Sequence, residues 1–299
     1  MTPRADVDSS ADPCSLGSLI AQTQQDLDAA GVEAADREAR WLIEHALGLT
    51  RSSQLIDHTR PVDQASVAKV HSYVVRRAAR EPLQYILGTQ EFCGLDFEVN
   101  PAVLIPRPET ELLVQEVIRR LPQGAQPTIV DVGTGSGCLA ITLARAVPSA
   151  RIIATDLSVQ ALETAKRNAR RHGVETRIAW LEGDLLLPLS NPDHKGTVTT
   201  IMANPPYIRE SDWNGLQPEV SYEPRIALVA GARGTEVHER LLDEAVRYLA
   251  PGGLLVMEIG HGQSDDIRAM IEHMPVYERL EVVPDEGGID RIMIVQRAR

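Results

Sequence analysis

The stretch that decides the fold is Thr128-Ile129-Val130-Asp131-Val132-Gly133-Thr134-Gly135-Ser136-Gly137, followed by a helical pattern over residues 138–146. Residues 128–130 are predicted to form a short apolar strand that leads into a glycine-rich loop. The glycines permit a tight turn and allow the backbone to approach a ligand closely. The stretch therefore predicts a strand, a ligand-binding turn and a helix, which is the opening unit of an open α/β sheet.

The spacing and charge around this loop indicate which ligand it binds. The loop reads Gly-x-Gly-x-Gly and not the dinucleotide fingerprint Gly-x-Gly-x-x-Gly, because position 138 is Cys. About 20 residues further on, a predicted strand over residues 151–155 ends in Asp156, whose carboxylate can accept hydrogen bonds from a ribose diol. Acidic groups at positions 131 and 156 suit a cationic nucleoside such as S-adenosylmethionine and would repel a dinucleotide phosphate. The predicted cofactor contacts in this part of the chain are Gly133, Thr134, Gly135, Ser136, Gly137 and Asp156.

A second motif, Asn204-Pro205-Pro206-Tyr207, follows a β-branched and apolar stretch over residues 198–203 that predicts a buried strand. Asn204 would then lie at the carboxyl edge of the sheet, where open sheets bind their ligands. The prolines have fixed φ and cannot donate hydrogen bonds, so they hold the local carbonyls outward as acceptors. Tyr207 adds a flat face for stacking. The motif predicts a clamp for a planar nitrogen with N–H donors, such as a carboxamide or the exocyclic amine of a base.

Three further segments narrow the match to a family. They are residues 80–88 (REPLQYILG), Glu91-Phe92 and residues 104–111 (LIPRPETE). Together with the two motifs above, they resemble the release factor glutamine methyltransferases, also called the HemK family, over residues 16–295. The resemblance implies a class I fold that uses S-adenosylmethionine and releases S-adenosylhomocysteine. It also implies methylation of the side-chain amide of the Gln in the Gly-Gly-Gln motif of class 1 peptide chain release factors, which would modulate translation termination.

The clamp can be assigned roles for an amide substrate. Asn204 would accept one amide N–H through its side-chain oxygen, and the carbonyl of Pro205 would accept the other. These acceptors would orient the nitrogen, with reacting atoms about 3–3.5 Å apart, and stabilise positive charge as it forms. Tyr207 would stack on the amide plane, and Pro206 completes the predicted substrate site. No strong base is required, because the methylated nitrogen becomes acidic and can lose its proton afterwards.

Five other residues are candidates for the same site. Asp184 would contact the adenine amine or simply form a turn. Leu185 stands where the family often has an aromatic residue, so it would offer an apolar wall to the adenine ring instead. Asn204 of the clamp would also contact the cofactor. Arg107 and Glu109 either cover the entry to the site or form a structural ion pair. Glu258 ends a predicted strand at the same edge, as a ligand contact or as a polar strand end.

Composition and charge restrict the class of protein and of partner. The 299 residues are 43% hydrophobic and 24% charged, which is typical of a soluble globular protein. No apolar run approaches the roughly 18 residues that span a bilayer, and the N-terminus lacks a signal-peptide pattern, so we expect a cytoplasmic protein without a membrane partner. The three cysteines and scattered histidines have no metal spacing, so no metal is expected. The net charge of −12 favours a protein partner over nucleic acid.

The chain is predicted to divide into three parts. Residues 1–84 show helical periodicity and are interpreted as a substrate-recognition domain, of which residues 1–14 are expected to be disordered. Residues 85–100 alternate apolar and polar positions around Cys93-Gly94, which predicts a hairpin linker. Residues 101–299 would form the methyltransferase domain of a monomer.

Strands alternate with helices in this last part, so we expect an α/β fold with a doubly wound, mostly parallel sheet. The resemblance implies seven strands, with an antiparallel member in the closing pair. The remaining predicted helices cover residues 109–121, 160–172, 237–249 and 264–274, and the remaining predicted strands cover residues 177–181, 254–259, 277–283 and 291–296.

Two other functions remain open at this point. A methyltransferase that acts on an exocyclic amine of DNA or RNA would use the same clamp, although the acidic charge and residues 105–111 count against it. A noncatalytic adaptor would bind a partner through the helical domain while the larger domain merely holds ligand. The intact Asp156 and Asn204 argue against the adaptor.

Overall fold

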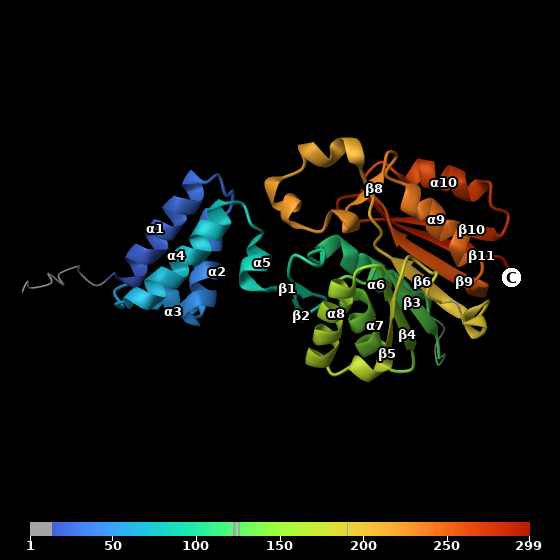
Figure 1. The fold of residues 1–299 in the computed structure, drawn as a ribbon, viewed down its shortest axis with the longest axis horizontal. Coiled ribbons are helices and arrows are strands. Elements are labelled where there is room, and N and C mark those ends of the chain that lie inside the picture. Colours follow the sequence, from blue (N-terminus) through green and yellow to red (C-terminus); the bar gives the residue numbers. More distant parts are fainter. Residues whose placement is uncertain (1–13, 122–123, 125, 190) are drawn as a thin grey trace, which may run out of the picture. The chain divides into compact units, whose positions relative to one another are not determined.

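The computed structural model describes residues 14–121, 124, 126–189 and 191–299, so residues 1–13 of the predicted disordered tail lie outside the described residues. The chain divides between Leu87 and Gly88 into two compact units. The first unit contains the predicted helical region and the second contains the sheet, as the ribbon in Figure 1 shows. In the described part of the chain, no helix is long and apolar enough to cross a membrane.

The first unit consists of helices, as predicted. Polar residues begin three of them, because the side chains of Ser15, Thr50 and Asp63 accept the backbone N–H three residues later. Apolar residues at helical spacing form a separate core. The helices are α1 (Leu16–Ala29), α2 (Ala35–Leu47), α3 (Arg51–Ile56), α4 (Gln64–Ala78) and α5 (Leu83–Leu87).

The predicted hairpin is shorter than residues 85–100. Residues up to Leu87 continue α5, and only β1 (Thr89–Phe92) and β2 (Leu95–Glu98) pair as antiparallel strands. Cys93 and Gly94 both have positive φ, 50° and 74°, which is the backbone that a tight two-residue hairpin turn requires. Phe92 and Phe97 are buried in the core of the second unit, so the hairpin is part of that unit's packing.

The second unit contains a seven-stranded sheet within the described residues, in the order β10-β11-β9-β6-β3-β4-β5. The strands β9, β6, β3, β4 and β5 are parallel, and β11 is antiparallel to both of its neighbours. The predicted α/β class, the number of strands and the antiparallel closing pair are confirmed. The strands are β3 (Thr128–Val132), β4 (Arg151–Asp156), β5 (Ile178–Glu182), β6 (Val198–Ala203), β9 (Leu249–Glu258), β10 (Tyr277–Pro284) and β11 (Asp290–Arg297).

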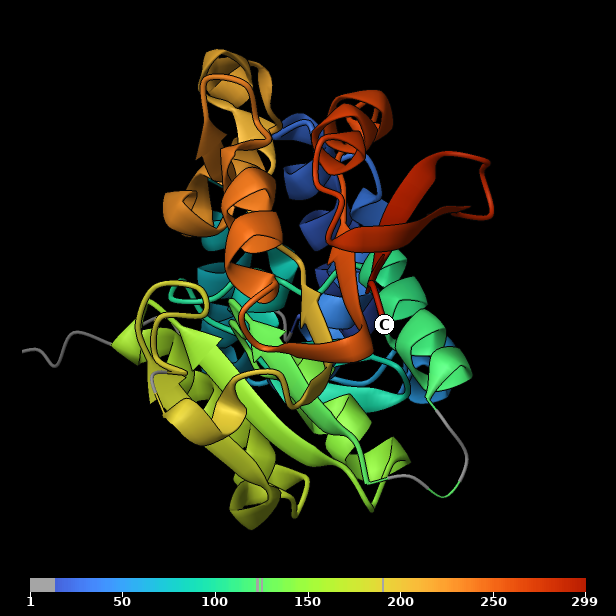
Figure 2. The same ribbon diagram turned by 90° about the vertical axis from the view of Figure 1, so that its right-hand side faces the viewer.

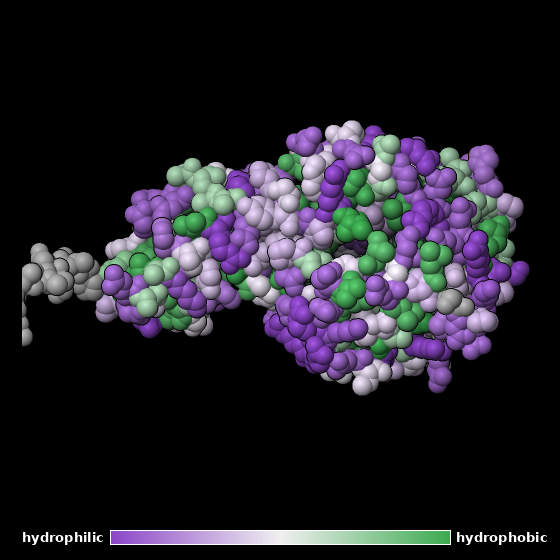
Figure 3. Space-filling view, viewed as in Figure 1, coloured by the Kyte–Doolittle hydropathy of each residue, from purple (hydrophilic) through white to green (hydrophobic). Residues whose placement is uncertain are grey.

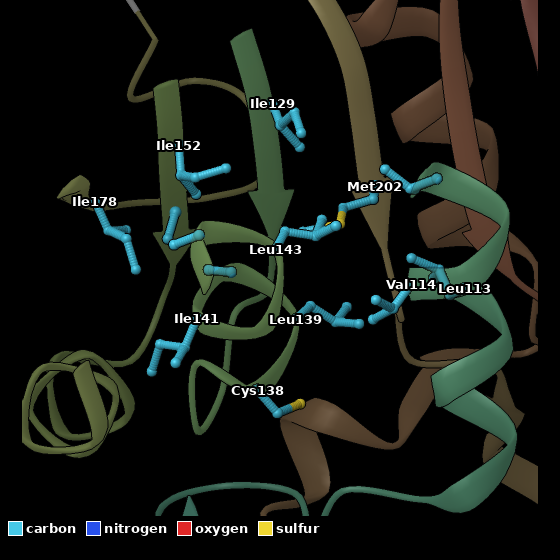
Figure 4. Packing of buried hydrophobic residues seen from close by; sticks show 14 of the residues in the cluster. Leu113, Val114, Ile129, Cys138, Leu139, Ile141, Leu143, Ile152, Ile178 and Met202 are labelled. Atoms are coloured by element: carbon cyan, nitrogen blue, oxygen red, sulfur yellow. The ribbon is translucent and has the colours of Figure 1, made fainter. Parts of the chain in front are cut away.

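Helices cover both faces of this sheet (Figure 2). One apolar cluster joins the sheet to α6, α7 and α8, and a second joins its other face to α9 and α10. Neighbouring strand residues alternate between the clusters because successive side chains point to opposite faces. In Figure 4, Leu139 and Leu143 of α7 point toward Val114 of α6 and Met202 of β6. The helices are α6 (Glu111–Arg120), α7 (Cys138–Ala146), α8 (Val159–Arg171), α9 (Glu236–Ala245) and α10 (Ser264–Glu272).

Two regions differ from the predicted elements. Strand β9 begins at Leu249 and not at residue 254 as predicted, so residues 251–253 lie inside the strand, with an irregularity in its pairing with β6. A Cβ at Gly253 would meet the carbonyl oxygen of Val198 at 3.0 Å, so the close approach of the two backbones requires glycine there. Residues 208–231, for which nothing was predicted, form a cap that joins β6 to α9. It contains β7 (Ile208–Arg209), η4 (Glu210–Gly215), η5 (Pro218–Tyr222), η6 (Arg225–Ala227) and β8 (Val229–Gly231).

Candidate active site

A cavity of about 530 Å³ lies at the carboxyl ends of β3, β4 and β6. The register places Val132 of β3 beside both Thr155 of β4 and Ala203 of β6, so the residues that follow them meet at one edge. The chain order reverses between β3 and β6, and such a reversal is where open α/β sheets bind their ligands. Figure 3 also shows apolar side chains gathered on the face of this unit that is turned toward the viewer.

The predicted site residues fall into those that line this cavity and those that lie behind it. The residues that line it are Gly133, Gly135, Asp156, Asp184, Leu185, Asn204, Pro205 and Pro206. Thr134, Ser136, Gly137 and Tyr207 are not among the described lining residues. The cavity wall also includes residues for which no role was predicted, namely Val103, Leu104, Leu157, Pro224, Ile226, Ala227 and Arg240.

The glycine loop is built by backbone geometry. Gly133, Gly135 and Gly137 have φ of 71°, 55° and 82°, which L side chains rarely adopt. A Cβ at Gly133 would meet no heavy atom within 4 Å, so its front is open to the cavity. A Cβ at Gly137 would approach Ile141 Cδ1 to 2.9 Å and Ala165 Cβ to 3.0 Å. The first two glycines therefore shape the cavity, whereas Gly137 permits α7 and α8 to pack closely.

Asp131 supports the loop from below. Its side chain is fully buried, and Oδ2 accepts hydrogen bonds from the Thr134 hydroxyl at 2.6 Å and the Ala140 N–H at 3.2 Å. Its Oδ1 is buried without a partner in the described structure. Burial raises the pKa of this carboxyl to about 7, because two hydrogen bonds only partly replace lost hydration. Asp131 therefore fixes the loop without reaching the cavity.

Asp156 combines a structural and a binding position. Oδ2 accepts the Gly135 N–H and Oδ1 accepts the Ser158 N–H, both at 2.8 Å. Burial raises the pKa of this carboxyl, and the backbone hydrogen bonds oppose that rise. Each oxygen has lone pairs that these single bonds do not use, and the residue lines the cavity. The carboxylate is therefore placed to accept hydroxyl groups of a ligand.

Asp184 and Leu185 form the far side of this half of the cavity. The Asp184 carboxylate is paired with Arg240 at 2.6 Å, a partner that the sequence did not predict. Leu185 has φ of 46°, and its carbonyl accepts a hydrogen bond from the Thr155 hydroxyl at 2.9 Å. Thr155 thus helps to hold Leu185 in a backbone conformation that is uncommon for a leucine.

Asn204 is the first link of a buried hydrogen-bonded chain. Its Nδ2 donates to Thr110 Oγ1 at 3.1 Å, and the Thr110 hydroxyl donates to Glu258 Oε2 at 2.6 Å. Thr110 and Glu258 are each only 2% exposed, so water does not compete for these bonds. Burial raises the pKa of the Glu258 carboxyl to about 7, and the hydrogen bond from Thr110 opposes that rise. Thr110 was not predicted as a site residue.

Tyr207 is oriented toward Glu258 and not along the cavity wall. Its hydroxyl lies 3.5 Å from Glu258 Oε1, a long contact, and its ring edge lies against Gly260. Burial raises the pKa of this phenol above its ordinary value. The Tyr207 carbonyl accepts a hydrogen bond from Gln263 Nε2 at 2.9 Å. In this structure the Tyr207 side chain contacts Glu258 of the Asn204 network. The stacking predicted for it stays a prediction.

A part-buried ion pair joins the most family-specific segment, residues 104–111, to the cap. The Arg107 guanidinium donates to Glu223 Oε1, and the Ile105 N–H donates to Glu223 Oε2 at 3.0 Å. The Glu223 side chain is 2% exposed, so this carboxylate holds the cap and the segment together away from water. The partner of Arg107 is therefore Glu223 and not Glu109. Neighbours of this contact on both sides, including Leu104 and Pro224, line the cavity.

The sequence did not reveal the residues that hold the predicted site residues in place by hydrogen bonds. Thr110 lies inside the recognised segment 104–111, but nothing local marks its hydroxyl as the partner of Asn204. Glu223 and Gln263 lie in stretches that carry no motif. His238 is fully buried, and its Nε2 donates to the Glu258 carbonyl at 2.9 Å, which holds the end of β9. Burial lowers the pKa of this imidazole, so it is neutral at pH 7.

Comparison with known proteins decides the family. The chain is 43% identical over 264 residues to the release factor glutamine methyltransferase of Geobacter sulfurreducens, a match that covers 88% of this chain and 90% of that protein. It is 41% identical to the enzyme of the same name from Nitratidesulfovibrio vulgaris, over 94% of this chain and 95% of that protein. This chain belongs to the release factor glutamine methyltransferase family. The family that the sequence motifs predicted is therefore confirmed.

Matches to individual domains agree with the family. The PrmC N-terminal domain matches residues 18–88, and the methyltransferase small domain matches residues 108–216. The fold also resembles the catalytic domain of hMettl16, solved with a hairpin of the MAT2A 3′UTR, with a TM-score of 0.53 at 14% identity over 78% of this chain and 82% of that one. A second METTL16 methyltransferase domain gives 0.51 at 16% identity over 68% and 88%. At these identities the likeness supports the methyltransferase fold alone.

The cavity fits the cofactor that a methyltransferase of this family requires, and the prediction of S-adenosylmethionine is confirmed. Gly133 and Gly135 leave open space where a side chain would intrude. Asp156 would offer acceptors for ribose hydroxyls, and Leu185 would offer an apolar wall beside Asp184, since all three residues line the cavity. The carboxylates around this half suit a ligand with a positive charge.

Proposed function

We propose that this protein transfers a methyl group from S-adenosylmethionine to the side-chain amide nitrogen of the Gln in the Gly-Gly-Gln motif of class 1 peptide chain release factors. The observation that carries the proposal is Asn204, which lines the cavity while its amide nitrogen is bound to Thr110. Its amide oxygen is then left to accept an N–H from a substrate. Relatives that match over most of the chain are named for this reaction.

The two halves of the cavity have separate tasks. S-adenosylmethionine, when bound, supplies an electrophilic methyl group on a positively charged sulfur. Gly133, Gly135 and Asp156 hold the nucleoside, and Asp184 and Leu185 contact its base. Asn204 Oδ1 and the Pro205 carbonyl accept the two N–H groups of the substrate amide and orient its nitrogen lone pair. Because these acceptors are fixed before substrate arrives, they stabilise the positive charge that develops on nitrogen.

The charge of the chain supports a protein substrate over a nucleic acid. With 42 acidic and 30 basic residues, the surface lacks the cationic excess that phosphate binding requires. The cap around the cavity also contributes apolar residues, including Ile226, which is 60% exposed. A protein that acts on release factors works in the cytoplasm, and we expect it to work as a monomer.

A parallel labelling experiment tests this proposal. The protein is incubated with S-adenosylmethionine labelled on the methyl group and, in separate reactions, with a release factor, duplex DNA and RNA. We expect label on the release factor only, and peptide mass spectrometry should place it on the Gln of Gly-Gly-Gln. Label on DNA or RNA would favour the amine methyltransferase. Cofactor binding without transfer to any of the three would favour the noncatalytic adaptor.

The helical unit is proposed to supply release-factor selectivity. It has its own core, and its described residues lack a cluster with an evident chemical purpose. A folded substrate needs more contact area than one Gln-bearing loop provides, since specific interfaces usually bury about 1,200–2,000 Å². Removal of residues 1–87 should leave cofactor binding intact and raise KM for the whole release factor far more than for a Gly-Gly-Gln peptide. Equal loss on both substrates would instead assign the unit a stabilising role.

A further inference from the structure

We propose that Thr110 and Glu258 are positioning residues that fix the direction of the Asn204 amide, so that the site accepts a hydrogen-bond donor and rejects an acceptor. The inference rests on the proposed function of Asn204 and deepens it. The three side chains come from distant segments, since Asn204 and Thr110 are 94 positions apart and Thr110 and Glu258 are 148 positions apart. Their arrangement therefore belongs to the tertiary structure of the site.

The hydrogens available to Thr110 and Glu258 limit how the two side chains can bond. A threonine hydroxyl has one hydrogen to donate and two lone pairs to accept, and an ionised carboxylate can only accept. The 2.6 Å bond to Glu258 Oε2 therefore uses the single Thr110 hydrogen. While Glu258 is ionised, Thr110 Oγ1 can only accept from its other neighbour, so the Asn204 atom 3.1 Å away is the amide nitrogen. This orientation follows from the chemistry of the partners.

The fixed orientation decides what the cavity offers. One Nδ2 hydrogen is bound to Thr110, which leaves the second Nδ2 hydrogen and Oδ1, and among the described residues no hydrogen bond is made to Oδ1. An acceptor-only Oδ1 recognises an amide or amine N–H. A flipped amide would present N–H groups instead, which would leave the two substrate donors facing a donor. The direction of one buried bond thus selects the class of substrate group.

A proton on Glu258 would permit the reverse direction. A protonated carboxyl can donate to Thr110 Oγ1, which would free the Thr110 hydrogen to donate to Asn204 Oδ1 and would withdraw that oxygen from the cavity. Burial raises the pKa of the Glu258 carboxyl to about 7, so both forms are accessible near neutral pH. The ionised form is the one that keeps Oδ1 available.

Several groups surround this carboxyl and set its charge. The Thr110 hydroxyl and the more distant Tyr207 hydroxyl stabilise the ionised form, and so does the Arg291 guanidinium. Glu109 opposes ionisation. His238 contacts the Glu258 backbone carbonyl and is neutral, because burial lowers its pKa. Since none of these groups replaces Thr110 at Oε2, the direction of the Asn204 bond depends on the Thr110–Glu258 pair.

Matched substitutions test this inference in the full-length protein. Thr110→Val keeps the shape but removes the hydroxyl, whereas Thr110→Ser keeps the hydroxyl. We expect Thr110→Val to lower kcat for release factor at least tenfold, with the Kd for S-adenosylmethionine within twofold of wild type, and Thr110→Ser to keep at least half of kcat. A kcat within twofold of wild type for Thr110→Val would overturn the inference. Equal losses in Thr110→Val and Thr110→Ser would overturn it as well.

The orientation itself can be measured without turnover. In ¹H–¹⁵N spectra of the side-chain amides, assigned with Asn204→Asp, one Nδ2 proton of Asn204 should exchange slowly with solvent. Thr110→Val should abolish that protection, and Thr110→Ser should retain it. An Asn204 amide that is unaffected by Thr110→Val would contradict the inference. This readout remains decisive even if wild-type protein failed to methylate release factor, so the two proposals can fail separately.

The pH profile separates a positioning role from a merely structural one. Glu258→Gln keeps the volume but can donate to Thr110 at any pH, so we expect kcat about tenfold below wild type. Wild-type kcat should rise with pH through about 7 as Glu258 loses its proton, and this rise should be absent in Glu258→Gln. A rise of the same size in both proteins would overturn the role of Glu258.

Discussion

The two halves of the active-site cavity are built in different ways. In the cofactor half, Asp156 accepts hydrogen bonds from Gly135, 21 residues away, and from Ser158, two residues away. In the substrate half, Asn204 depends on Thr110 across 94 residues, and Ile105 depends on Glu223 across 118. The glycine loop and Asp156 are therefore built by contacts that are short in sequence, although Asp184 on the far side of this half pairs with Arg240 across 56 positions. The substrate half forms only when distant segments meet.

This difference predicts which changes are confined to one half. Because its hydrogen bonds are short in sequence, the cofactor site should keep its affinity when residues of the substrate half are changed. Because the substrate half depends on contacts between distant segments, a change in any one of these segments should lower methyl transfer.

The largest effect is expected at the centre of the substrate half. Asn204→Ala should lower methyl transfer by roughly 10²–10³-fold, as for loss of one hydrogen bond that stabilises a transition state. Cofactor affinity should remain nearly unchanged, because the glycine loop and Asp156 are built without Asn204. Steady-state kinetics and calorimetry measure the two quantities, with the exposed Asn214→Ala as the matched control. Near-normal turnover would remove Asn204 from its assigned role.

The counterpart in the cofactor half is Asp156→Ala. It should weaken S-adenosylmethionine binding by about 1.5–3 kcal/mol, the range for hydrogen bonds to a charged acceptor. Asp184→Ala should cost less, because that carboxylate is already paired with Arg240. Calorimetry gives both affinities. An unchanged affinity in Asp156→Ala would mean that other groups hold the ribose.

The next prediction concerns the buried Asp131 carboxyl, whose raised pKa should make the stability of the protein depend on pH. Its pKa is raised from 3.8 to about 7, so its protonated form stabilises the fold below pH 4 and that contribution is lost as pH rises through 7. Asp131→Asn should flatten the decline of the unfolding free energy between pH 5 and 7 by about 1 kcal/mol per pH unit. Chemical denaturation at several pH values measures it.

Asp63 provides a control of opposite sign. Hydrogen bonds from Ser66 lower the pKa of that carboxyl, so its contribution to stability is lost only as pH falls below its ordinary value. Asp63→Asn should therefore leave the slope between pH 5 and 7 unchanged. A slope that is equally steep in wild type and Asp131→Asn would show that Asp131 is ionised in the native protein throughout this range.

The smallest effect is expected at the joint between the cap and residues 105–107. Glu223→Gln keeps the shape but places a neutral amide against Arg107, so the cap should loosen and KM for release factor should rise about five- to tenfold, which is about 1–1.4 kcal/mol. Glu210→Gln breaks an exposed pair with Arg225 on the same cap and should have no measurable effect. Equal KM values for the two variants would assign Glu223 no part in substrate binding.

The sequence by itself determined the glycine loop and Asp156 of the cofactor half, but not the pairing of Asp184 with Arg240. The glycines at 133–137, the strand before them and Asp156 after the next strand are close in sequence, and each has a local physical reason that can be recognised from residue type and spacing. The motif Asn204–Tyr207 also predicted a strand-end clamp, and the parallel sheet followed from the alternation of strands and helices. Local steric rules and periodicity determine these features, so no distant contact was needed to find them.

Only the tertiary structure decided how the clamp is held. The partners Thr110 and Glu258 of Asn204, and the partner Glu223 of Arg107, come from segments whose proximity depends on the packing of the whole sheet and the cap. The orientation of Tyr207 toward Glu258 has the same origin. A hydrogen bond needs atoms within about 3.5 Å in a suitable geometry, and residue type alone does not specify which distant atoms satisfy that condition.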